Sequence, residues 1–419
     1  MKRRAFLEAG RAPAGILCAA LLALSPAACS PAKGKTYRNI GYVFQRGTDI
    51  EKLDVTKVTH INYSFGLIHN NEYLEVNPAT GKPFGTPPNP DVRTPEPVPD
   101  GLLHTIYLPE KVASDLSRLD ILRAKNPRLK VLLSVGGFDC RGFSDAAADA
   151  ESRKAFAASC RETVDRYRLD GIDLDWEFPV IAGWGSIKGR PEDRENFTLL
   201  LREVRAAVGP GKLLTVAGSG NLEFVNRWTE FAAVVELLDF INIMTYDFQY
   251  GTSYYGSSLY ASTAWPTELV ADEYNCDKSV RYYIRNGCPP DKINLGLAIG
   301  AVVPDPVRRD AAAWAEIRRK LAAAGAPPYG FVGLKTVKDL LEDRNGFMKK
   351  WDPDARNMYI STVLADGREQ FVLSYIEPRS IAEKAKFVKE LGLGGIMFWE
   401  FGSDYDNSLV ACIEAELRR

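Results

Sequence analysis

Short runs of apolar and β-branched residues recur along the chain, and amphipathic stretches separate them. We predict eight β-strands from the runs, at residues 40–44, 60–65, 130–135, 171–175, 213–217, 240–244, 293–299 and 395–399. The intervening stretches have the apolar spacing of one-sided helices, at residues 111–125, 151–168, 194–208, 229–238, 278–286 and 381–391. Eight alternations of strand and helix favour an α/β fold of the (β/α)8 TIM-barrel type over an open sheet.

Two stretches are too long to be simple connections. Residues 68–108 are rich in Pro, Asn and Gly, which is typical of a long loop after the second strand. Residues 303–372 fall between the seventh and eighth strands and contain a helical stretch at 309–324. The hairpin pattern NMYISTVLADGREQFVLSYI follows, with ADG as its turn. We therefore predict a barrel at 38–302 and 373–419 that is interrupted by a small α+β insertion domain at 303–372.

Residues 1–28 have the composition of an export signal and lie outside the predicted fold. A basic start, MKRR, precedes an apolar run at 14–24 that is too short to span a bilayer. SPAAC then ends at Cys29 like a bacterial lipoprotein cleavage box, although Pro26 departs from the usual residue, and RRAFLE is similar to a twin-arginine signal. We predict an exported lipoprotein attached to a membrane at Cys29, followed by a linker at 29–37. An ordinary signal peptide that leaves a periplasmic or secreted protein is the alternative.

Charge and cysteine content narrow the classes of partner. With 53 basic and 54 acidic residues the net charge is -1, so the basic footprint that nucleic acid binding requires is missing. An exported compartment permits disulfides among the cysteines beyond Cys29, but their spacing does not fix a pairing. No cysteine spacing typical of zinc sites occurs, and the chain has 3 His, so we predict no metal and no cofactor. We also expect a monomer.

The stretch LDGIDLDWEFP, residues 169–179, places carboxylates in what otherwise has the character of a buried strand. Side chains two residues apart share a face of a strand, so Asp173, Asp175 and Glu177 point one way. The opposite face carries the bulky residues Ile172, Leu174 and Trp176. Two charges about 6.6 Å apart repel by about 2.5 kcal/mol at a dielectric constant of about 20. We therefore predict a raised pKa and shared protons, which would supply an acid near neutral pH.

The last carboxylate of the motif, Glu177, falls at the carboxyl end of its strand, where the active sites of such barrels open. A solvated acidic edge strand is a weaker interpretation, because the opposite face is bulky and apolar. A calcium-binding loop would need Gly where the chain has Phe178. A phosphoryl-transfer strand would need a phosphate cradle, and nothing in the sequence resembles one. We expect Asp170 to brace the entry of the strand.

DGIDLDWEFP resembles the DGxDxDxE signature of family 18 glycoside hydrolases, the chitinase family. Other segments match the family in order over residues 38–410, namely NIGYVF, THINYSFGLI, LLSVGG, INIMTYDF and LGLGGIMFWEF. FVLSYIEPRSIAEKAKFVKE is similar to the end of the family's α+β insertion and the helix after it. The resemblance implies a TIM barrel that hydrolyses β-1,4 linkages of N-acetylglucosamine polymers and oligomers, such as chitin and chitooligosaccharides.

The resemblance also implies a retaining mechanism in which the substrate supplies the nucleophile. The acetamido carbonyl of an N-acetylglucosamine unit attacks its own anomeric carbon. Glu177 is expected to protonate the leaving oxygen and then to activate water. Asp175 would bind the acetamido N–H, Asp173 would take up the shared proton, and Tyr246 would donate to the acetamido oxygen.

Aromatic residues at strand ends are candidate binding residues, because sugars present C–H surface that stacks on rings. The resemblance places Trp399 beneath the sugar next to the scissile bond. It matches further positions of the groove to Tyr42, Phe65, Phe138, Met244 and Asp247, for each of which packing in the core is the alternative. We expect Gly136 and Gly137 to let the backbone approach substrate, or else to form a tight turn. Further candidate platforms are Trp184, Trp265 and Trp351, whereas Trp176 should pack in the barrel.

Three positions depart from the family pattern. Where the family often has Tyr and Arg after the seventh strand, GLAIGAV places Gly300 and Val302, and Phe138 stands where Trp is common. Because the catalytic set is complete, these departures concern substrate preference. An endo-β-N-acetylglucosaminidase that cuts the chitobiose core of N-glycans is the alternative within the same fold. A non-hydrolytic chitin-binding lectin is the alternative of another class, and the presence of Glu177 opposes it.

Overall fold

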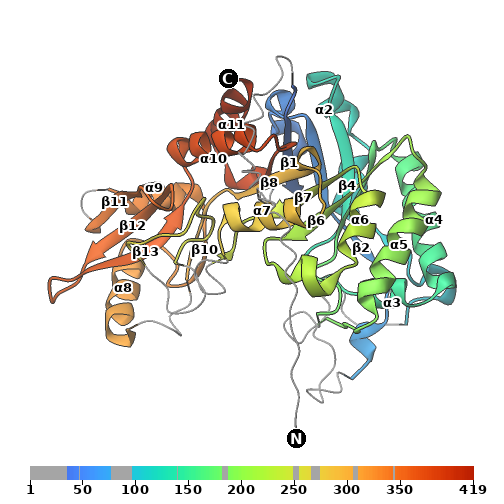
Figure 1. Cartoon of the computed structure of the whole chain (residues 1–419), viewed down its shortest axis with the longest axis horizontal. Helices are drawn as coiled ribbons and strands as arrows, with labels where there is room; N and C mark the ends of the chain where they lie inside the picture. The colour runs from blue at the N-terminus through green and yellow to red at the C-terminus, as the bar shows by residue number, and fades with distance from the viewer. Residues whose placement is uncertain are drawn as a thin grey trace, which may run out of the picture.

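Eight parallel strands close into a barrel in the computed structural model, which describes residues 35–46, 48–76, 97–138, 140–181, 187–248, 254–265, 274–304, 310–342 and 345–419 (Figure 1). The strands are β1 (Arg38–Phe44), β2 (His60–Ile68), β4 (Lys130–Gly136), β5 (Gly171–Asp175), β6 (Leu213–Ser219), β7 (Phe240–Met244), β8 (Ile293–Ala298) and β14 (Gly395–Trp399). The ring closes because β1 pairs with both β2 and β14. The predicted TIM barrel is confirmed, and the ends of each predicted strand agree with those of the observed strand to within three residues.

Helices surround the barrel on its outer face (Figure 1). They are α1 (Glu110–Leu116), α2 (Asp120–Lys125), α3 (Phe143–Ala148), α4 (Ala150–Arg166), α5 (Asp193–Val208), α6 (Phe231–Leu237), α7 (Cys276–Arg285), α10 (Pro378–Glu390) and α11 (Ser408–Arg418). The single helix predicted at 111–125 is wrong, because the chain turns at Ser117, whose hydroxyl donates to the carbonyl of Ala113 at 2.8 Å. Helix α3 was not predicted, because its 6 residues are too few to display a helical period.

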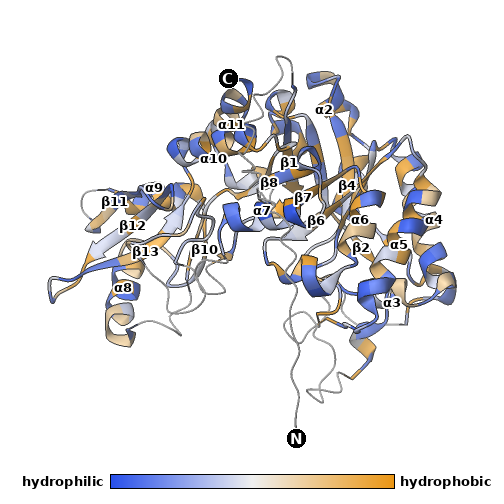
Figure 2. Ribbon diagram, in the orientation of Figure 1, coloured by the Kyte–Doolittle hydropathy of each residue, from blue (hydrophilic) through white to orange (hydrophobic). Residues whose placement is uncertain are grey.

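The outer faces of the strands pack against the helices, and the inner faces fill the barrel. Figure 2 shows the hydrophobic strands enclosed by helices whose outer sides are hydrophilic. The barrel interior holds a small apolar cluster of Ile40, Tyr42, Phe240 and Met397. Polar side chains share the same interior: Asn62, Ser134, Asp173, Thr215, Asn242 and Asn294 are all fully buried. Polar groups at this depth need hydrogen-bond partners, and their arrangement shapes the candidate site.

The strand entry at β5 is braced as predicted. The carboxylate of Asp170 accepts a hydrogen bond from the backbone N–H of Val131 at 2.9 Å and pairs with Lys130 at 2.9 Å. Arg123 of α2 lies 3.8 Å from the same carboxylate. These contacts fix the start of β5 against β4, at the end of the barrel opposite Glu177.

A second sheet of five antiparallel strands lies beside the barrel (Figure 1). Its strands follow the order β10-β9-β13-β12-β11. They are β9 (Ala301–Val303), β10 (Gly330–Val332), β11 (Phe347–Asp352), β12 (Asn357–Val363) and β13 (Glu369–Tyr375), accompanied by α8 (Ala311–Ala323) and α9 (Leu334–Leu340). The hairpin expected around ADG joins β12 to β13. This sheet has its own core around Trp314 of α8, and the division of the chain into domains at 303 and 372 stays a prediction.

The loop after β7 fastens the second sheet to the barrel. The hydroxyl of Tyr255 donates to Asp352 at 2.7 Å, and the backbone N–H of Leu259 donates to the carbonyl of Ala355 at 2.9 Å. Lys384 of α10 is fully buried and reaches the hydroxyl of Ser257 at 2.9 Å. The sheet is therefore held by side chains as well as by chain continuity with β8.

The cysteines of the described residues are all unpaired thiols, namely Cys140, Cys160, Cys276, Cys288 and Cys412. The disulfides that an exported compartment permits are thus not formed among them. In the same part of the chain, none of the helices combines the length and the apolar character that crossing a membrane would take. Cys29 and the export signal lie outside the described residues.

We predict that Gly395→Ala weakens the closure of the barrel. A Cβ at Gly395 would lie 2.0 Å from the carbonyl oxygen of Arg38, so β14 would have to move away from β1. Overpacking of this kind costs about 1–3 kcal/mol. Thermal unfolding should show a clear fall in Tm, whereas Gly211→Ala, where a Cβ meets nothing within 4 Å, should leave Tm within about a degree. Equal Tm values for the two variants would contradict this account of the β1–β14 contact.

Candidate active site

The carboxylates of β5 occupy the inside of the barrel, and the bulky residues between them face outward. Asp173 is fully buried and Asp175 is 3% exposed, whereas Glu177 follows the end of the strand and is half-buried. On the other face, Trp176 stacks on Phe143 of α3 at 5.2 Å between ring centroids. The prediction that Trp176 packs in the barrel wall is confirmed. The two faces of the motif therefore serve packing and chemistry separately.

Asp173 receives hydrogen bonds from several strands of the barrel. One carboxylate oxygen accepts from the hydroxyls of Tyr42 and Ser134, each at 2.8 Å. The other accepts from the hydroxyl of Thr215 and, at 3.4 Å, from the amide of Asn242. The donors belong to β1, β4, β6 and β7, so closure of the barrel is what brings them together. Sequence reasoning did not find Ser134, Thr215 or Asn242, because their convergence depends on strand register.

Tyr42 is placed differently from the predicted groove wall. Its ring is 2% exposed and belongs to the barrel interior, where its hydroxyl is committed to Asp173. The ring edge also contacts Trp399, with 5.8 Å between the centroids. The position of Tyr42 at the middle of β1 lies too deep for open contact with a saccharide. Tyr42 therefore supports the carboxylate of Asp173 from within the barrel.

Burial raises the pKa values of both aspartates of the motif. The pKa of Asp173 is raised by burial and lowered by its hydrogen bonds from Thr215, Tyr42 and Ser134, with a net rise. The pKa of Asp175 is raised much further, first by burial, then by the charge of Glu177 and that of Asp173. The predicted rise is therefore present, but mutual repulsion, which we expected to be its cause, ranks behind loss of solvation.

Asp175 shares a hydrogen bond with the side chain of Glu177. Its other oxygen, Oδ1, is buried and has no hydrogen-bond partner among the described residues. An acceptor without a donor in a buried site is costly, so a polar group of a ligand would be favoured there. Asp175 thus offers one oxygen to Glu177 and the other to the space of the barrel mouth.

Tyr246 follows β7 and stands near these acids. Burial raises the pKa of Tyr246 well above the ordinary value, and the charge of Asp175 raises it further. Gly296 of β8 leaves room for the ring, because a Cβ there would come within 3.0 Å of Tyr246. A phenol held neutral in this way can only serve as a hydrogen-bond donor or acceptor, not as a base. Met244 is half-buried against the interior cluster, and Asp247 is exposed with φ of 61°.

Trp399 lies at the end of β14 among other rings of the barrel mouth. Its ring stacks on Phe65 with 5.6 Å between centroids and an angle of 18° between planes. Phe44 lies at 5.6 Å and Tyr42 at 5.8 Å from the same indole. These contacts hold a half-buried indole beside Tyr42, whose hydroxyl donates to Asp173, and the role of Trp399 as a sugar platform stays a prediction.

Gly136 and Gly137 bring the end of β4 against protein atoms. A Cβ at Gly136 would lie 2.1 Å from the carbonyl oxygen of Asp175, and one at Gly137 would lie 2.7 Å from the ring of Phe65. Both glycines have positive φ, of 131° and 96°. The backbone N–H of Gly137 also donates to the carbonyl of Asp175 at 2.9 Å. The glycines thus position Asp175 and Phe65, and contact with substrate stays a prediction. Phe138, the next residue, is 54% exposed at the rim.

The departure at Gly300 has a physical reason that the sequence did not reveal. Gly300 has φ of 123°, and a Cβ there would lie 2.8 Å from the ring of Phe331. Phe331 is carried by β10, which pairs with β9, and it lies opposite Val302. The ring of Phe331, 53% exposed, therefore occupies the place beside the barrel that a side chain at 300 would take.

The remaining tryptophan candidates lie away from the carboxylates. Trp265 packs between Phe371 and Tyr359, at 5.7 and 6.0 Å between ring centroids. The guanidinium of Arg379 lies 4.0 Å from the centre of the Trp351 ring. Both rings thus have protein partners, which favours packing over sugar binding. Trp184 lies outside the described residues. Within the described part of the chain, no group of three or more His, Cys, Asp or Glu side chains is placed to hold a metal ion.

The closed parallel barrel with its acids at the carboxyl ends of the strands is the architecture of TIM-barrel enzymes. A family model, Glycosyl hydrolases family 18, matches residues 38–404. The chain therefore belongs to the glycosyl hydrolases of family 18.

Relatives of known description are similar over most of the chain. Chitinase A1 of Niallia circulans is 30% identical over 436 residues, which cover 94% of this chain and 60% of that protein. Chitotriosidase-1 of Mus musculus is 31% identical over 68% of this chain and 61% of its own length. The chain thus spans about three fifths of the length of these curated relatives. A solved structure of a family 18 N-acetylglucosaminidase from Paenibacillus barengoltzii is 31% identical, with a TM-score of 0.68, and the match covers 91% of this chain and 100% of that one.

We predict that the stability of the protein relative to Asp175→Asn falls as pH rises. The folded pKa of Asp175 lies well above the value of about 3.9 in an unfolded chain. The stabilising contribution of the group is thus complete below pH of about 3.9 and is lost as pH rises through the folded pKa. Each unit of difference in pKa adds about 1.4 kcal/mol to the change.

Urea unfolding at about pH 5 and pH 8 measures this difference. Asp406→Asn is the control, because hydrogen bonding from Ser408 and the charge of Lys338 lower the pKa of Asp406, which is ionised at both pH values. Its effect on the free energy of unfolding should be the same at the two pH values. A wild type that gains stability over Asp175→Asn between pH 5 and pH 8 would refute the assignment.

Proposed function

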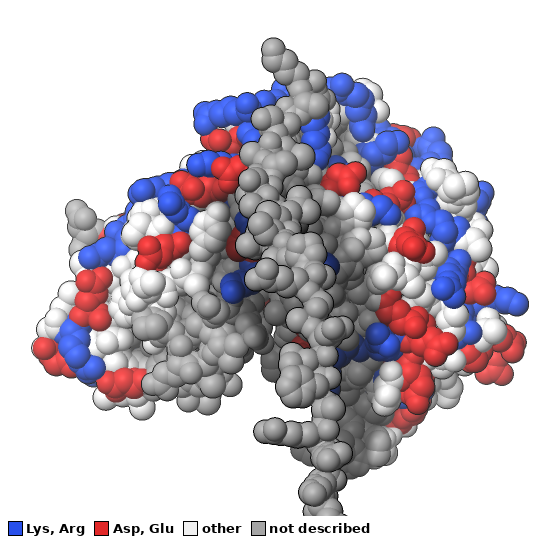
Figure 3. Space-filling view, in the orientation of Figure 1, with Lys and Arg blue, Asp and Glu red and all other residues white. Residues whose placement is uncertain are grey.

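We propose that the protein hydrolyses β-1,4 linkages of N-acetylglucosamine oligomers and polymers with retention of configuration. One observation carries the proposal: Asp173, Asp175 and Glu177 rise in a row from the barrel interior to its mouth, with Asp175 hydrogen-bonded to Glu177. Trp399, which contacts Tyr42 above its hydrogen bond to Asp173, is the proposed aromatic platform. The curated relatives described as chitinases support the same substrate class. On the face seen in Figure 3, basic and acidic side chains are interspersed, which suits an uncharged substrate.

The position of the acids favours a nucleophile that comes from the substrate. Retaining glycosidases with two carboxylates place one as acid and the other as nucleophile, about 5 Å apart across the sugar ring. Here Asp173 and Asp175 belong to β5, which Glu177 directly follows, so the aspartates lie beneath the acid on its own side. The acetamido carbonyl of the substrate would attack its own anomeric carbon, which breaks the glycosidic bond and gives a cyclic oxazolinium ion. Glu177 would protonate the leaving oxygen and then take a proton from the water that opens this ion.

Asp175 is proposed to hold the proton that Glu177 uses. The four donors to Asp173 favour its ionised form, whereas Asp175 has a more strongly raised pKa and no such set of donors. The shared proton then resides on Asp175 in the free protein, and not on Asp173. It passes along the hydrogen bond to Glu177 and on to the leaving oxygen. Asp175 is left negative next to the developing positive charge, and its oxygen Oδ1 accepts the acetamido N–H.

Tyr246 and Trp399 are proposed to orient the sugar. The neutral phenol of Tyr246 would donate to the acetamido oxygen and so hold it for attack on the anomeric carbon. The indole of Trp399 would stack under the same sugar. Release of single N-acetylglucosamine units from a chain end is a second candidate, which the solved N-acetylglucosaminidase supports because it matches along its whole length.

We predict that Glu177→Gln lowers kcat on chitooligosaccharides by at least about 100-fold, as expected for loss of a general acid. Substrate binding should persist, because the amide has nearly the same shape. The assay follows products from N-acetylglucosamine oligomers beside a glycoprotein that carries N-glycans. Trp351→Phe, a change far from the acids, is the matched control and should retain activity. Cleavage by Glu177→Gln at the wild-type rate would rule out Glu177 as the acid, and cleavage of the glycoprotein alone would favour the endo-β-N-acetylglucosaminidase.

We also propose export of the protein and attachment to a membrane through lipid at Cys29. The sequence of residues 1–28 and the small residues before Cys29 support this proposal. Cys29→Ser should move the protein from the membrane fraction to the soluble fraction and abolish incorporation of labelled fatty acid. Cys412→Ser is the control and should change neither result. Labelling that survives Cys29→Ser would contradict lipid attachment at this residue.

A further inference from the structure

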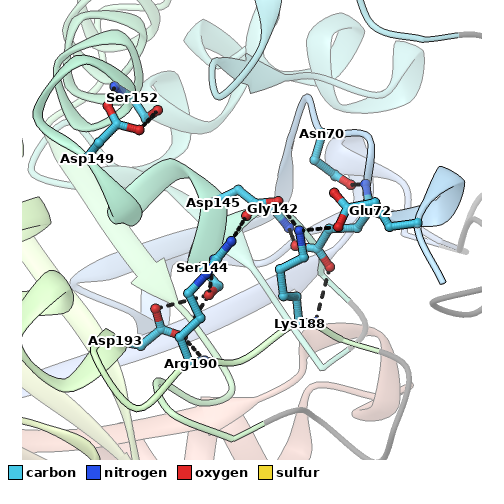
Figure 4. A network of polar contacts seen from close by, with 11 residues as sticks. Asn70, Glu72, Gly142, Ser144, Asp145, Asp149, Ser152, Lys188, Arg190 and Asp193 are labelled. Atoms are coloured by element: carbon cyan, nitrogen blue, oxygen red, sulfur yellow. Dashed lines mark hydrogen bonds and ion pairs between the residues drawn. The ribbon is translucent and has the colours of Figure 1, made fainter. Parts of the chain in front are cut away.

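Three loops at the mouth of the barrel meet at one buried carboxylate, Glu72 (Figure 4). Glu72 lies in the loop after β2 and is fully buried. Its Oε1 accepts the backbone N–H of Gly142, in the loop after β4, at 2.7 Å. Its Oε2 accepts the backbone N–H of Lys188, in the loop after β5, at 3.2 Å. A single side chain therefore joins segments that are far apart in the sequence.

Ion pairs around Glu72 hold the same segments from the other side (Figure 4). Asp145 of α3 pairs with Lys188 at 2.8 Å and with Arg190. Asp193, a second fully buried carboxylate, accepts the backbone N–H of Arg190 at 2.7 Å and the hydroxyl of Ser144 at 2.8 Å. Two buried acids thus bind two backbone N–H groups near the end of the loop after β5. These hydrogen bonds and ion pairs connect the start of α3 to the start of α5.

Burial disfavours the charged form of Glu72, so a gain in stability is a weak explanation for its place here. Burial raises the pKa of Glu72 to about 7, despite the hydrogen bonds from Gly142 and Lys188. Buried ionic groups are often replaceable by apolar residues without loss of stability, but they fix geometry. The geometry fixed here concerns the rim of the barrel, since Phe138 lies in the loop that Gly142 ends.

Glu177 itself is held independently of Glu72. It directly follows β5, and Phe178 stacks on Trp228 with 5.3 Å between centroids and 23° between planes. Pro179 is buried as well. Loosening the loops at Gly142 and Lys188 would thus displace the rim, but leave the acid on its strand.

We propose that Glu72 is a positioning residue that ties the loops after β2, β4 and β5 together and thereby sets the affinity of the barrel mouth for an N-acetylglucosamine oligomer. This inference rests on the proposed function. It goes beyond that function because it assigns the affinity to a residue that touches neither the substrate nor the acids of β5. Once substrate is bound, chemistry at Glu177 proceeds at its ordinary rate.

The test compares Glu72→Gln with Glu75→Gln. Gln keeps the shape of Glu72, but its amide nitrogen cannot accept an N–H, so one of the two bonds is lost and two donors face each other. KM for a tetramer of N-acetylglucosamine should rise about tenfold or more, as loss of a charge-assisted hydrogen bond implies, with kcat within about twofold. Backbone amide exchange should accelerate at Gly142 and Lys188. Glu75 pairs with the same Lys188 at 2.7 Å but is 48% exposed, so Glu75→Gln should leave both quantities unchanged.

The outcomes separate this proposal from the proposed function. A wild type that cleaves no oligomer refutes the function, and amide exchange then still tests the connection between the loops. An active wild type whose KM is the same in Glu72→Gln overturns the role of Glu72, as does a fall in kcat with KM unchanged. If Glu72→Gln does not fold, amide exchange is instead measured on the Glu177→Gln variant with and without the tetramer of N-acetylglucosamine. Slower exchange at Gly142 and Lys188 on binding supports the proposal, and unchanged exchange refutes it.

Discussion

A carboxylate at the centre of a barrel imposes the constraint on which the rest of the site depends. Asp173 is fully buried, and loss of hydration strongly disfavours its charge. The cost is offset by hydroxyl and amide donors from β1, β4, β6 and β7, which no single strand could supply. Asp173 therefore obtains its full set of hydrogen bonds only when the barrel closes. The identities of Tyr42, Ser134 and Thr215 follow from that need rather than from contact with a substrate.

The next acid on the same face has a different environment, although it is equally buried. Asp175 lacks the donors that Asp173 has, and its carboxyl is joined to Glu177 instead. Burial raises the pKa of both aspartates, and the pKa of Asp175 rises further because the charge of Glu177 adds to burial and no comparable set of donors opposes it. Different environments for chemically identical groups are the general means by which proteins separate an acid from a base. Glycines at 136 and 137 maintain the arrangement, because any side chain there would displace Asp175 or Phe65.

Much of this could be predicted from the sequence, and the limits have physical causes. Strand positions follow from local apolar runs, and the two faces of β5 follow from the period of a strand, so the barrel and the placement of Trp176 were predictable. The depth of Tyr42 was not, because it depends on how far β1 is shifted against its neighbours. Burial, the main cause of the raised pKa values of Asp173 and Asp175, likewise arises from closure of the barrel. The spacing of residues along β5 contains no information about that closure. The helices on either side of Ser117 and the helix α3 are too short to show a helical period in the sequence.

Depth also explains which parts of the molecule depart from the family pattern. The deep residues around Asp173 are bound to one another across the barrel, so a change in one leaves a buried partner unsatisfied. At the rim, the rings of Phe138 and Phe331 are exposed and lie outside the barrel strands, and the loop that carries Phe138 is tied to Glu72 at Gly142. The ring of Phe331 fills the place beside Gly300, so a side chain at position 300 would meet a residue of the second sheet. The interior of the barrel is thus held by the hydrogen bonds of one buried acid, Asp173, whereas the departures at Phe138 and Gly300 lie outside that network.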